Sequence, residues 1–266
     1  MSAWARLDDE LDAWHASGRR ATLWCRDDDG YRDGAPLRRL LEIGRAENVP
    51  IALAIIPAAL EPSLADAVAE FALATIVQHG YAHCNHAPSG TRNCELSAHR
   101  PVAESVAELA QGRVRLVREF ATRFTAVLVP PWNRIDAEVV ARLPEAGFSG
   151  LSTFGPRARA YAASGVSQFN THVDLIAWRR GRAFIGVDTA IDRMVGHLRA
   201  RRDGNADPAE PTGILTHHVN LDDAAWHFLA ELFARTRAHK AVAWLDVVGV
   251  FGIGDTPPTS ISSRSA

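Results

Sequence analysis

Apolar runs of strand-like length alternate along this chain with segments of helical periodicity. Strand-like runs are expected at 21–25, 50–56, 74–77, 126–129, 150–154, 213–216 and 241–251, with a further extended stretch at 167–175. Helices are expected at 3–16, from about 36, from about 62, and at 101–124, 136–146, 188–202 and 223–237. Strands that alternate with helices are typical of a parallel sheet covered by helices. We therefore expect an α/β fold.

The chain shows no internal repeat and no linker that would divide it. Its 266 residues, 47% of them hydrophobic, are enough to bury one large core. We expect a single domain over residues 1–252, with an amphipathic leading helix in 1–18. Residues 253–266 are rich in serine, threonine and proline, which predicts a disordered tail.

Polar side chains follow the expected strands at the points where the strands end. Asp27, Asp28 and Asp29 come after the first apolar run, and His79 and His83 come after the third. Each group alone has a simpler interpretation, a solvated turn for the acids or a hydrogen-bonded loop histidine. Together they would be costly beside a core unless a cation neutralises them or they transfer protons. In α/β barrels such residues converge at the carboxyl ends of the strands, so a metal-dependent hydrolase is the first hypothesis.

Composition and charge exclude several other classes. The formal net charge is -2 and the pI is near 6.6, so the chain lacks the basic surface of a nucleic-acid-binding protein and we expect no such partner. The N-terminus does not resemble a secretion signal, and no apolar run approaches the ~20 residues of a membrane span. The three cysteines are expected to be free thiols in a cytoplasmic protein. The oligomeric state, monomer or homo-oligomer, is left open.

The polar clusters resemble the motifs of the NodB-type polysaccharide deacetylases, and the resemblance spans about 23–244. Asp28-Asp29-Gly30 is similar to the first motif of that family, and His79-x3-His83 is similar to the second. The resemblance implies a distorted (β/α)7 barrel, with Asp28 as general base and with Asp29, His79 and His83 as metal ligands. A register one residue earlier would give Asp27 and Asp28 the first two roles. The glycine that follows Asp29 favours the later register.

The third motif of the family, Arg-Pro-Pro-x-Gly, corresponds to residues 129–133 here but begins with valine. In the family the missing arginine orients the catalytic base. Arg26 or Arg134 is expected to replace it. Trp132 and Asn133, which follow the two prolines, are expected to line the substrate pocket.

The last two motifs contribute an acid and an imidazole. Asp174 with Trp178 is loosely similar to the fourth motif, and residues 215–217 match the fifth, Leu-x-His. By the resemblance, His217 is the general acid and Asp174 orients it. The neighbouring His218 is expected to face the other side of its strand as a packing residue.

The function that the resemblance implies is metal-dependent removal of an acetyl group from an N-acetylated sugar or related amide. The metal is expected to be Zn²⁺, with Co²⁺, Ni²⁺ or Mn²⁺ as alternatives. The substrate is a small molecule or a glycan, and a cytoplasmic location favours a soluble intermediate such as a sugar nucleotide. Two other hypotheses are hydrolysis of a non-acetyl C–N bond at the same metal and a non-catalytic sugar-binding or metal-binding protein. Residues expected to contact substrate or support the site are Arg26, Asp27, Tyr81, His86, Pro131, Trp132, Asn133, Arg134, Asp174 and Trp178.

Overall fold

The computed structural model describes residues 1–179 and 181–252, so the tail predicted for 253–266 lies outside the described residues. Its strands are β1 (Ala21–Gly30), β2 (Ile51–Ile55), β3 (Ala74–His79), β4 (Phe124–Val129), β5 (Gly150–Leu151), β6 (Tyr161–Ala163), β7 (Val166–Gln168), β8 (Val173–Asp174), β9 (Ile176–Ala177), β10 (Ala183–Phe184), β11 (Thr212–Thr216) and β12 (Val242–Trp244). Its α-helices are α1 (Ala3–Ala16), α2 (Ala35–Ala46), α3 (Ser63–Ala69), α4 (Val102–Phe120), α5 (Ala137–Ala141), α6 (Val187–Arg202), α7 (Asp223–Ala238) and α8 (Val247–Phe251). Short 3-10 turns are η1 (Pro57–Ala59), η2 (Ala121–Arg123), η3 (Pro131–Asn133), η4 (Leu143–Ala146) and η5 (His218–Asn220).

The main sheet is almost entirely parallel, which confirms the predicted α/β class. Its strands lie in the order β6-β7-β5-β4-β3-β2-β1-β11-β8, with β12 also paired to β1, and among the described strands of this sheet only the β6–β7 pair is antiparallel. The extended segment 166–175 pairs with β5 through Gln168 and with β11 through Val173. The segment 166–175 therefore connects β5 on one side with β11 on the other. The predicted α/β class with a mostly parallel central sheet is thus confirmed.

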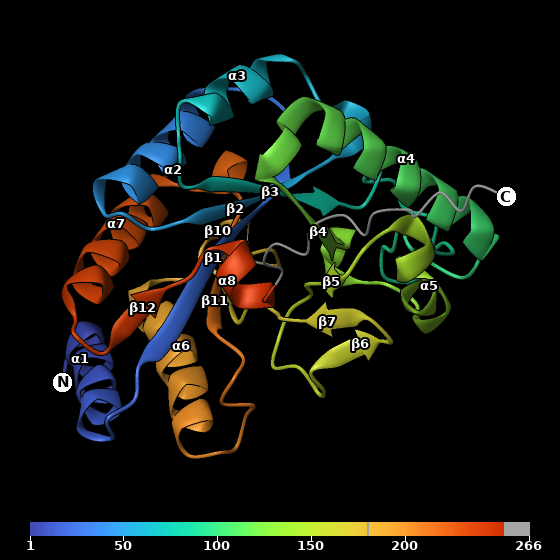
Figure 1. Cartoon of the computed structure of the whole chain (residues 1–266). Coiled ribbons are helices and arrows are strands. Elements are labelled where there is room, and N and C mark those ends of the chain that lie inside the picture. Colours follow the sequence, from blue (N-terminus) through green and yellow to red (C-terminus); the bar gives the residue numbers. More distant parts are fainter. Residues whose placement is uncertain (180, 253–266) are drawn as a thin grey trace, which may run out of the picture.

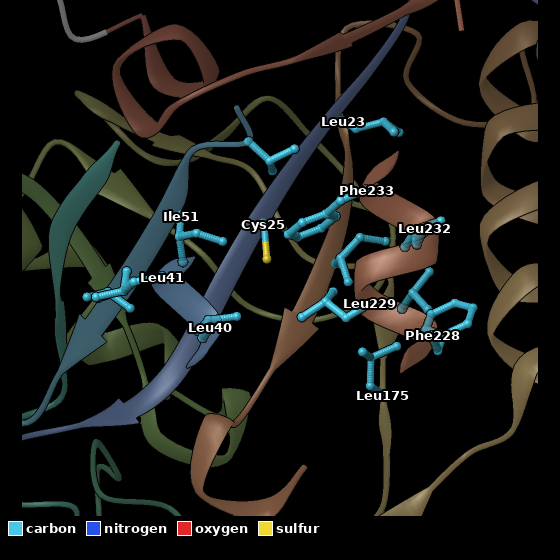
Figure 2. Close-up of a cluster of buried hydrophobic side chains, with 14 of the residues drawn as sticks. Leu23, Cys25, Leu40, Leu41, Ile51, Leu175, Phe228, Leu229, Leu232 and Phe233 are labelled. Atoms are coloured by element: carbon cyan, nitrogen blue, oxygen red, sulfur yellow. The ribbon is translucent and has the colours of Figure 1, made fainter. Parts of the chain in front are cut away.

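The strands separate two apolar layers because successive side chains point to opposite faces. Leu23 and Cys25 of β1 face outward, where they pack with leucines of α2 and phenylalanines of α7 (Figure 2). Trp24 faces inward and packs with Val77 and Val127 of the neighbouring strands. The helices other than α8 form an arc around the outside of the strands, and α8 packs on the inner apolar layer (Figure 1). No helix among the described residues is both long enough and apolar enough to cross a membrane.

The strand predicted for 241–251 is wrong in its second half. It ends with β12, and residues 247–251 form α8 instead. The Asp246 carboxylate caps this helix by accepting a hydrogen bond from the Gly249 N–H, 2.7 Å away. Phe251 then packs edge-to-face on Trp24 in the inner layer, with ring centroids 6.1 Å apart. A short apolar run has no period that distinguishes a strand from a buried helix, so packing in the inner layer decides the conformation.

Candidate active site

The aspartates at the end of β1 point to opposite faces of the sheet. Asp28 follows Arg26 on the inner face, because side chains alternate along a strand. Asp27 points toward the helices instead, where its carboxylate accepts hydrogen bonds from the Thr216 hydroxyl (2.6 Å) and the His218 N–H (2.9 Å). Asp27 was expected to support the pocket, and this is a correction. It instead forms a buried pair with His218, which was expected to face the other side of its strand as a packing residue.

Asp29 is turned toward the inner face by an irregularity in β1. The register of β1 against β2 shifts between Asp27 and Gly30, and Asp29 has a left-handed backbone with φ of 67°. A bulge of this kind bends a strand and redirects one side chain. His83, Trp132 and Asn133 also have positive φ values of 56° to 57°. Each such residue costs roughly 1–3 kcal/mol, and strain of this kind gathers at functional sites.

Asp29, His79 and His83 bring three potential metal ligands together. The Asp29 Oδ1 atom lies 3.1 Å from the His79 Nε2 atom and 3.3 Å from the His83 Nε2 atom. Ligand atoms around a tetrahedral Zn²⁺ with bonds of about 2.0–2.2 Å lie about 3.3 Å apart. The spacing of these three atoms therefore fits a divalent cation.

The polar contacts of this group also determine its protonation. The Nδ1 atom of His79 lies 3.1 Å from the Val129 carbonyl, so in the neutral ring Nδ1–H donates and the Nε2 lone pair faces Asp29. Burial disfavours the charged Asp29 carboxylate, but contacts with His79 and His83 outweigh it and lower the pKa of Asp29. Burial likewise opposes a charged His79, yet Asp29 and Asp28 raise the pKa of His79. The group thus holds an ionised carboxylate beside two imidazoles.

The turn between the two histidines is shaped by Gly80 and by a buried glutamate. Gly80 has φ of 53°, and a Cβ atom there would lie 1.9 Å from the Glu95 carboxylate and 2.6 Å from Pro131. Glu95 is fully buried and accepts hydrogen bonds from the backbone N–H groups of Tyr81 (3.2 Å) and Ala82 (2.7 Å). Sequence reasoning missed Glu95, because an acid in a long polar loop shows no pattern that would identify a buried partner.

Arg26, one of the two residues expected to replace the absent motif arginine, contacts Asp28 directly. Its Nε and Nη2 atoms bind the two carboxylate oxygens of Asp28 at 2.8 and 2.9 Å, and both residues are buried. The same guanidinium donates to the Ser152 hydroxyl and to the Asn133 side chain, each at 2.7 Å. Arg134, the other candidate, donates to a backbone carbonyl 2.8 Å away. Arg26 is therefore the residue that fixes the orientation of Asp28.

His217 follows β11 on the same side of the pocket, beside Asp174 and Trp178. The ring of Trp178 stands edge-on to the His217 ring, with centroids 4.7 Å apart. The Asp174 carboxylate, expected to orient His217, instead accepts hydrogen bonds from the Ile176 N–H (2.9 Å) and the Trp178 Nε1–H (2.7 Å). Within the described part of the chain, the His217 Nδ1 atom is buried without a hydrogen-bond partner. The expected Asp174–His217 hydrogen bond is thus not formed, although both residues line the pocket.

The pocket has a volume of about 540 Å³ and collects most of the expected residues. Its lining residues are Asp28, Asp29, His79, His83, Trp132, Asn133, Arg134, Phe154, Asp174, Trp178, Arg179, Arg182, His217 and Asn220. Sequence reasoning missed Phe154, Arg179, Arg182 and Asn220, which belong to irregular segments without a recognisable motif.

Besides Asp27, four expected residues do not line this pocket. Arg26 and Pro131 are buried behind its wall, and Tyr81 contributes backbone contacts in the turn before His83. His86 is exposed and its Nε2 atom lies 3.1 Å from an Arg100 nitrogen, away from the pocket. The spacing after His83 places His86 in the long loop, where no strand directs it inward.

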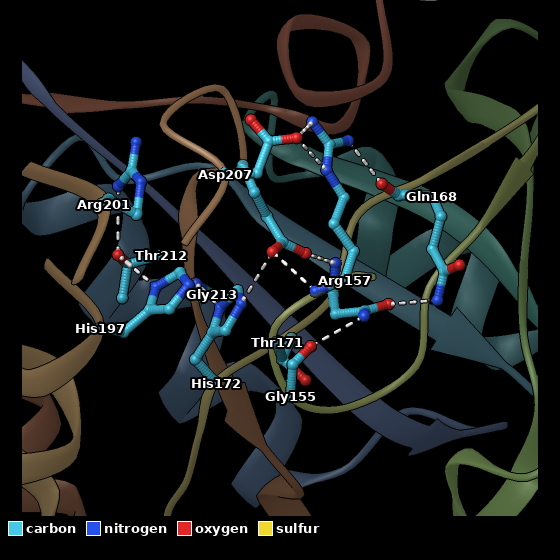
Figure 3. A network of polar contacts seen from close by, with 12 residues as sticks. Gly155, Arg157, Gln168, Thr171, His172, His197, Arg201, Asp207, Thr212 and Gly213 are labelled. Carbon is cyan, nitrogen blue, oxygen red and sulfur yellow. Dashed lines mark hydrogen bonds and ion pairs between the residues drawn. The ribbon is translucent and has the colours of Figure 1, made fainter. Parts of the chain in front are cut away.

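A second group of potential ligands, His172, His197 and Glu210, lies in a buried network (Figure 3). The two imidazole rings are stacked, with centroids 3.4 Å apart and planes at 17°. Nearly parallel rings cannot both direct an in-plane lone pair at one ion. In addition, the His172 Nδ1 atom accepts a hydrogen bond from the Gly213 N–H, so the proton of the neutral ring sits on Nε2, 3.4 Å from Glu210. The geometry of these three residues therefore favours a structural hydrogen-bond network over a metal site.

This network predicts a loss of stability in acid. Burial, followed by the charges of His172 and Arg201, lowers the pKa of His197 to about 2, while an unfolded chain binds that proton near the ordinary value of 6.5. The unfolded state therefore holds more protons below about pH 6.5, and stability falls as the pH falls, by about 1.4 kcal/mol per pH unit for one proton. We expect the slope of the unfolding free energy against pH, measured by urea denaturation between pH 7 and pH 5, to be shallower for His197→Asn than for wild type. His227→Asn, at an exposed position, should leave the slope unchanged; equal slopes in all three proteins would contradict the assignment.

The fold is shared with solved structures, although no family model and no curated protein matches the sequence. A Mycobacterium smegmatis protein assigned as a polysaccharide deacetylase aligns with a TM-score of 0.65 at 16% identity, over 88% of this chain and 90% of that one. A family 4 carbohydrate esterase from Streptomyces lividans, in complex with acetate, aligns with a TM-score of 0.55 at 15% identity, over 84% and 91%. A family 4 acetyl xylan esterase from Clostridium thermocellum, in complex with a cobalt ion, aligns with a TM-score of 0.50 at 13% identity, over 87% and 90%. The chain therefore has the polysaccharide-deacetylase fold that the motifs implied.

Proposed function

We propose that this protein is a metal-dependent hydrolase that removes an acetyl group from an N-acetylated sugar or a related amide. The observation that carries the proposal is the convergence of Asp28, His217 and the Asp29–His79–His83 group on one pocket. The shared fold adds support, since its solved examples include a carbohydrate esterase with bound acetate and an acetyl xylan esterase with bound cobalt.

Asp29, His79 and His83 are the residues that would hold the metal. Two imidazole nitrogens and one carboxylate oxygen suit Zn²⁺ and also Co²⁺, Ni²⁺ or Mn²⁺. A divalent metal bound there would lower the pKa of a coordinated water and polarise the acyl carbonyl. The Val129 carbonyl, by accepting from His79 Nδ1–H, keeps the His79 ring in the tautomer that presents Nε2 to the metal.

Asp28 and His217 would move the protons of the reaction. Asp28 lines the pocket beside Asp29 and is held by two hydrogen bonds from Arg26, so its carboxylate is oriented to take a proton from the attacking water. His217 faces the same pocket from β11 and would give a proton to the departing amine. A base and an acid placed on different strands allow both transfers without a covalent acyl intermediate.

The aromatic wall of the pocket favours a sugar as the group that carries the amide. Trp132 lies against the His83 ring, with centroids 4.4 Å apart, and Trp178 lies against the His217 ring. Trp178 and Phe154 are 41% and 42% exposed, and both line the pocket. Their faces are available to stack on the apolar face of a sugar ring. A non-acetyl amide would be cleaved by the same groups, and a substrate screen distinguishes it.

The contacts of Arg26 favour a catalytic protein over the non-catalytic hypothesis. That hypothesis depended on the absent motif arginine, without which the base would have no fixed orientation. Arg26 binds both oxygens of Asp28 from the neighbouring strand position on the same face. In this proposal Asp28 is the oriented base, His217 is the acid, and Asp29, His79 and His83 hold the metal.

Release of acetate by the purified protein, loaded with Zn²⁺ or Co²⁺, tests the proposal. N,N'-diacetylchitobiose and N-acetylglucosamine serve as neutral substrates. Asp28→Asn should lower kcat by about 10²–10⁴-fold, the contribution of a general base, while metal content stays equal to wild type. Asp33→Asn, at a surface ion pair, is the control and should leave both quantities unchanged. Equal activity in wild type and Asp28→Asn would contradict the role of Asp28.

A further inference from the structure

A second, larger cavity adjoins the candidate active site and shares a wall with it. Its volume is about 880 Å³, and Asn133 and Arg134 line both cavities. The other walls come from the loop before α4, from α5, and from residues 151–168 around β6 and β7. A substrate whose amide lies at the Asp29–His79–His83 group could therefore extend past Arg134 into this cavity.

Three arginines line the second cavity, and their charges are not balanced there. Arg92 and Arg159 are exposed and make no salt bridge within residues 1–179 and 181–252, and Arg134 donates only to a backbone carbonyl. Asp136 is the one carboxylate among the lining residues of this cavity in the described structure, and it accepts a hydrogen bond from the Ala98 N–H at 2.7 Å. The chain as a whole is slightly acidic, with a net charge of -2. The excess of positive charge is thus a local property of this cavity.

We propose that this cavity binds an oxyanion, a phosphate or a carboxylate, carried by the substrate. The inference rests on the proposed function for the position of the amide and adds a charged group to the substrate class. Guanidinium groups bind phosphate and carboxylate oxygens through paired hydrogen bonds, and they are weakly hydrated, so they suit a partly enclosed cavity. Arg134 lies between the two cavities and would contact the anion on the side nearest the amide.

Two further arginines line the active-site pocket itself. Arg179 and Arg182 line that pocket on the side of the β9–β10 hairpin. Neither makes a salt bridge within the described ranges, and both are exposed. Positive charge on both sides of the reacting groups raises the local concentration of an anionic substrate and its rate of association.

Substrate preference tests the inference in an assay that also uses a neutral compound. Wild type should cleave N-acetylglucosamine 1-phosphate with a kcat/KM at least about tenfold above that for N-acetylglucosamine, since one charge-assisted hydrogen bond is worth about tenfold. N-acetylmuramic acid provides the carboxylate arm and separates the two anion types. The double variant Arg92→Ala, Arg159→Ala should lose the preference and keep the rate on the neutral sugar. Equal rates of wild type on all three compounds would overturn the inference and leave the deacetylase proposal intact.

Binding of inorganic pyrophosphate tests the anion site without any turnover. Isothermal titration calorimetry should show a Kd at least about tenfold higher for the Arg92→Ala, Arg159→Ala variant than for wild type. Arg118→Ala, Arg237→Ala removes two exposed arginines elsewhere and should bind as wild type does. Arginine-dependent pyrophosphate binding without cleavage of any amide would support the anion site and contradict the proposed function. Identical pyrophosphate affinity in wild type and in both double variants would overturn the anion site.

Discussion

Replacing His79 and His83 together by alanine is expected to remove bound divalent metal from the protein and to abolish acetate release. Asp29 would then be the sole remaining ligand of the three, since its Oδ1 atom faces both Nε2 atoms. Elemental analysis should find about one equivalent of metal per chain in wild type and little in the variant. The rate should fall at least about a thousandfold, because metal activation of water and carbonyl is worth several kcal/mol.

His86→Ala is the matched control for this experiment. His86 lies in the same loop as His83 but is exposed and outside the pocket, so its removal should leave metal content and activity unchanged. Equal metal in wild type and in the His79, His83 variant, after supplementation with Zn²⁺, Co²⁺, Ni²⁺ and Mn²⁺, would contradict the assigned site. Loss of metal in His86→Ala would place the metal elsewhere in the loop.

Replacing Arg26 by methionine is expected to lower both stability and activity. The Asp28 carboxylate would be left buried without its guanidinium, and an uncompensated buried charge costs about 3–5 kcal/mol. Urea denaturation should show this loss in the free energy of unfolding. The double variant Arg26→Met, Asp28→Asn, which removes both charges, should recover a large part of it.

Arg26→Lys separates the orienting role from the structural one. Lysine keeps the positive charge but cannot bind both carboxylate oxygens in the plane that arginine provides. We expect kcat to fall about 10²-fold through misplacement of the Asp28 carboxylate, with KM little changed. A double variant as unstable as the sum of its single variants, or an unaltered kcat in Arg26→Lys, would show that Arg26 does not orient the base.

The order of strands and helices could be predicted from the sequence because it depends on local periodicity. Runs such as 50–56 and 74–77 became β2 and β3, and the helical segments at 101–124 and 188–202 became α4 and α6. At 247–251 the apolar run was compatible with either a strand or a helix, and it forms a helix that packs against Trp24. The residues of the candidate site that follow strands were found for the same reason, since a polar residue after an apolar run is visible without a structure.

What only the tertiary structure decided is which polar groups face one another. The alternation of side chains along β1 turned Asp27 away to His218, and the irregularity at Asp29 returned that carboxylate to the inner face. Arg26 donates a hydrogen bond to Asn133, although the two residues are 107 positions apart in the sequence.

The sequence by itself determined the α/β class, the strand-end motifs and the residue types available for metal and proton chemistry. These follow from short-range patterns, because backbone geometry repeats every two residues in a strand and every 3.6 in a helix. The partners of Arg26, the buried Glu95 and the arginine-lined cavity depended on contacts between distant segments. Hydrogen bonds and charges act over a few ångströms in space, so their pairing is settled only when the chain has folded.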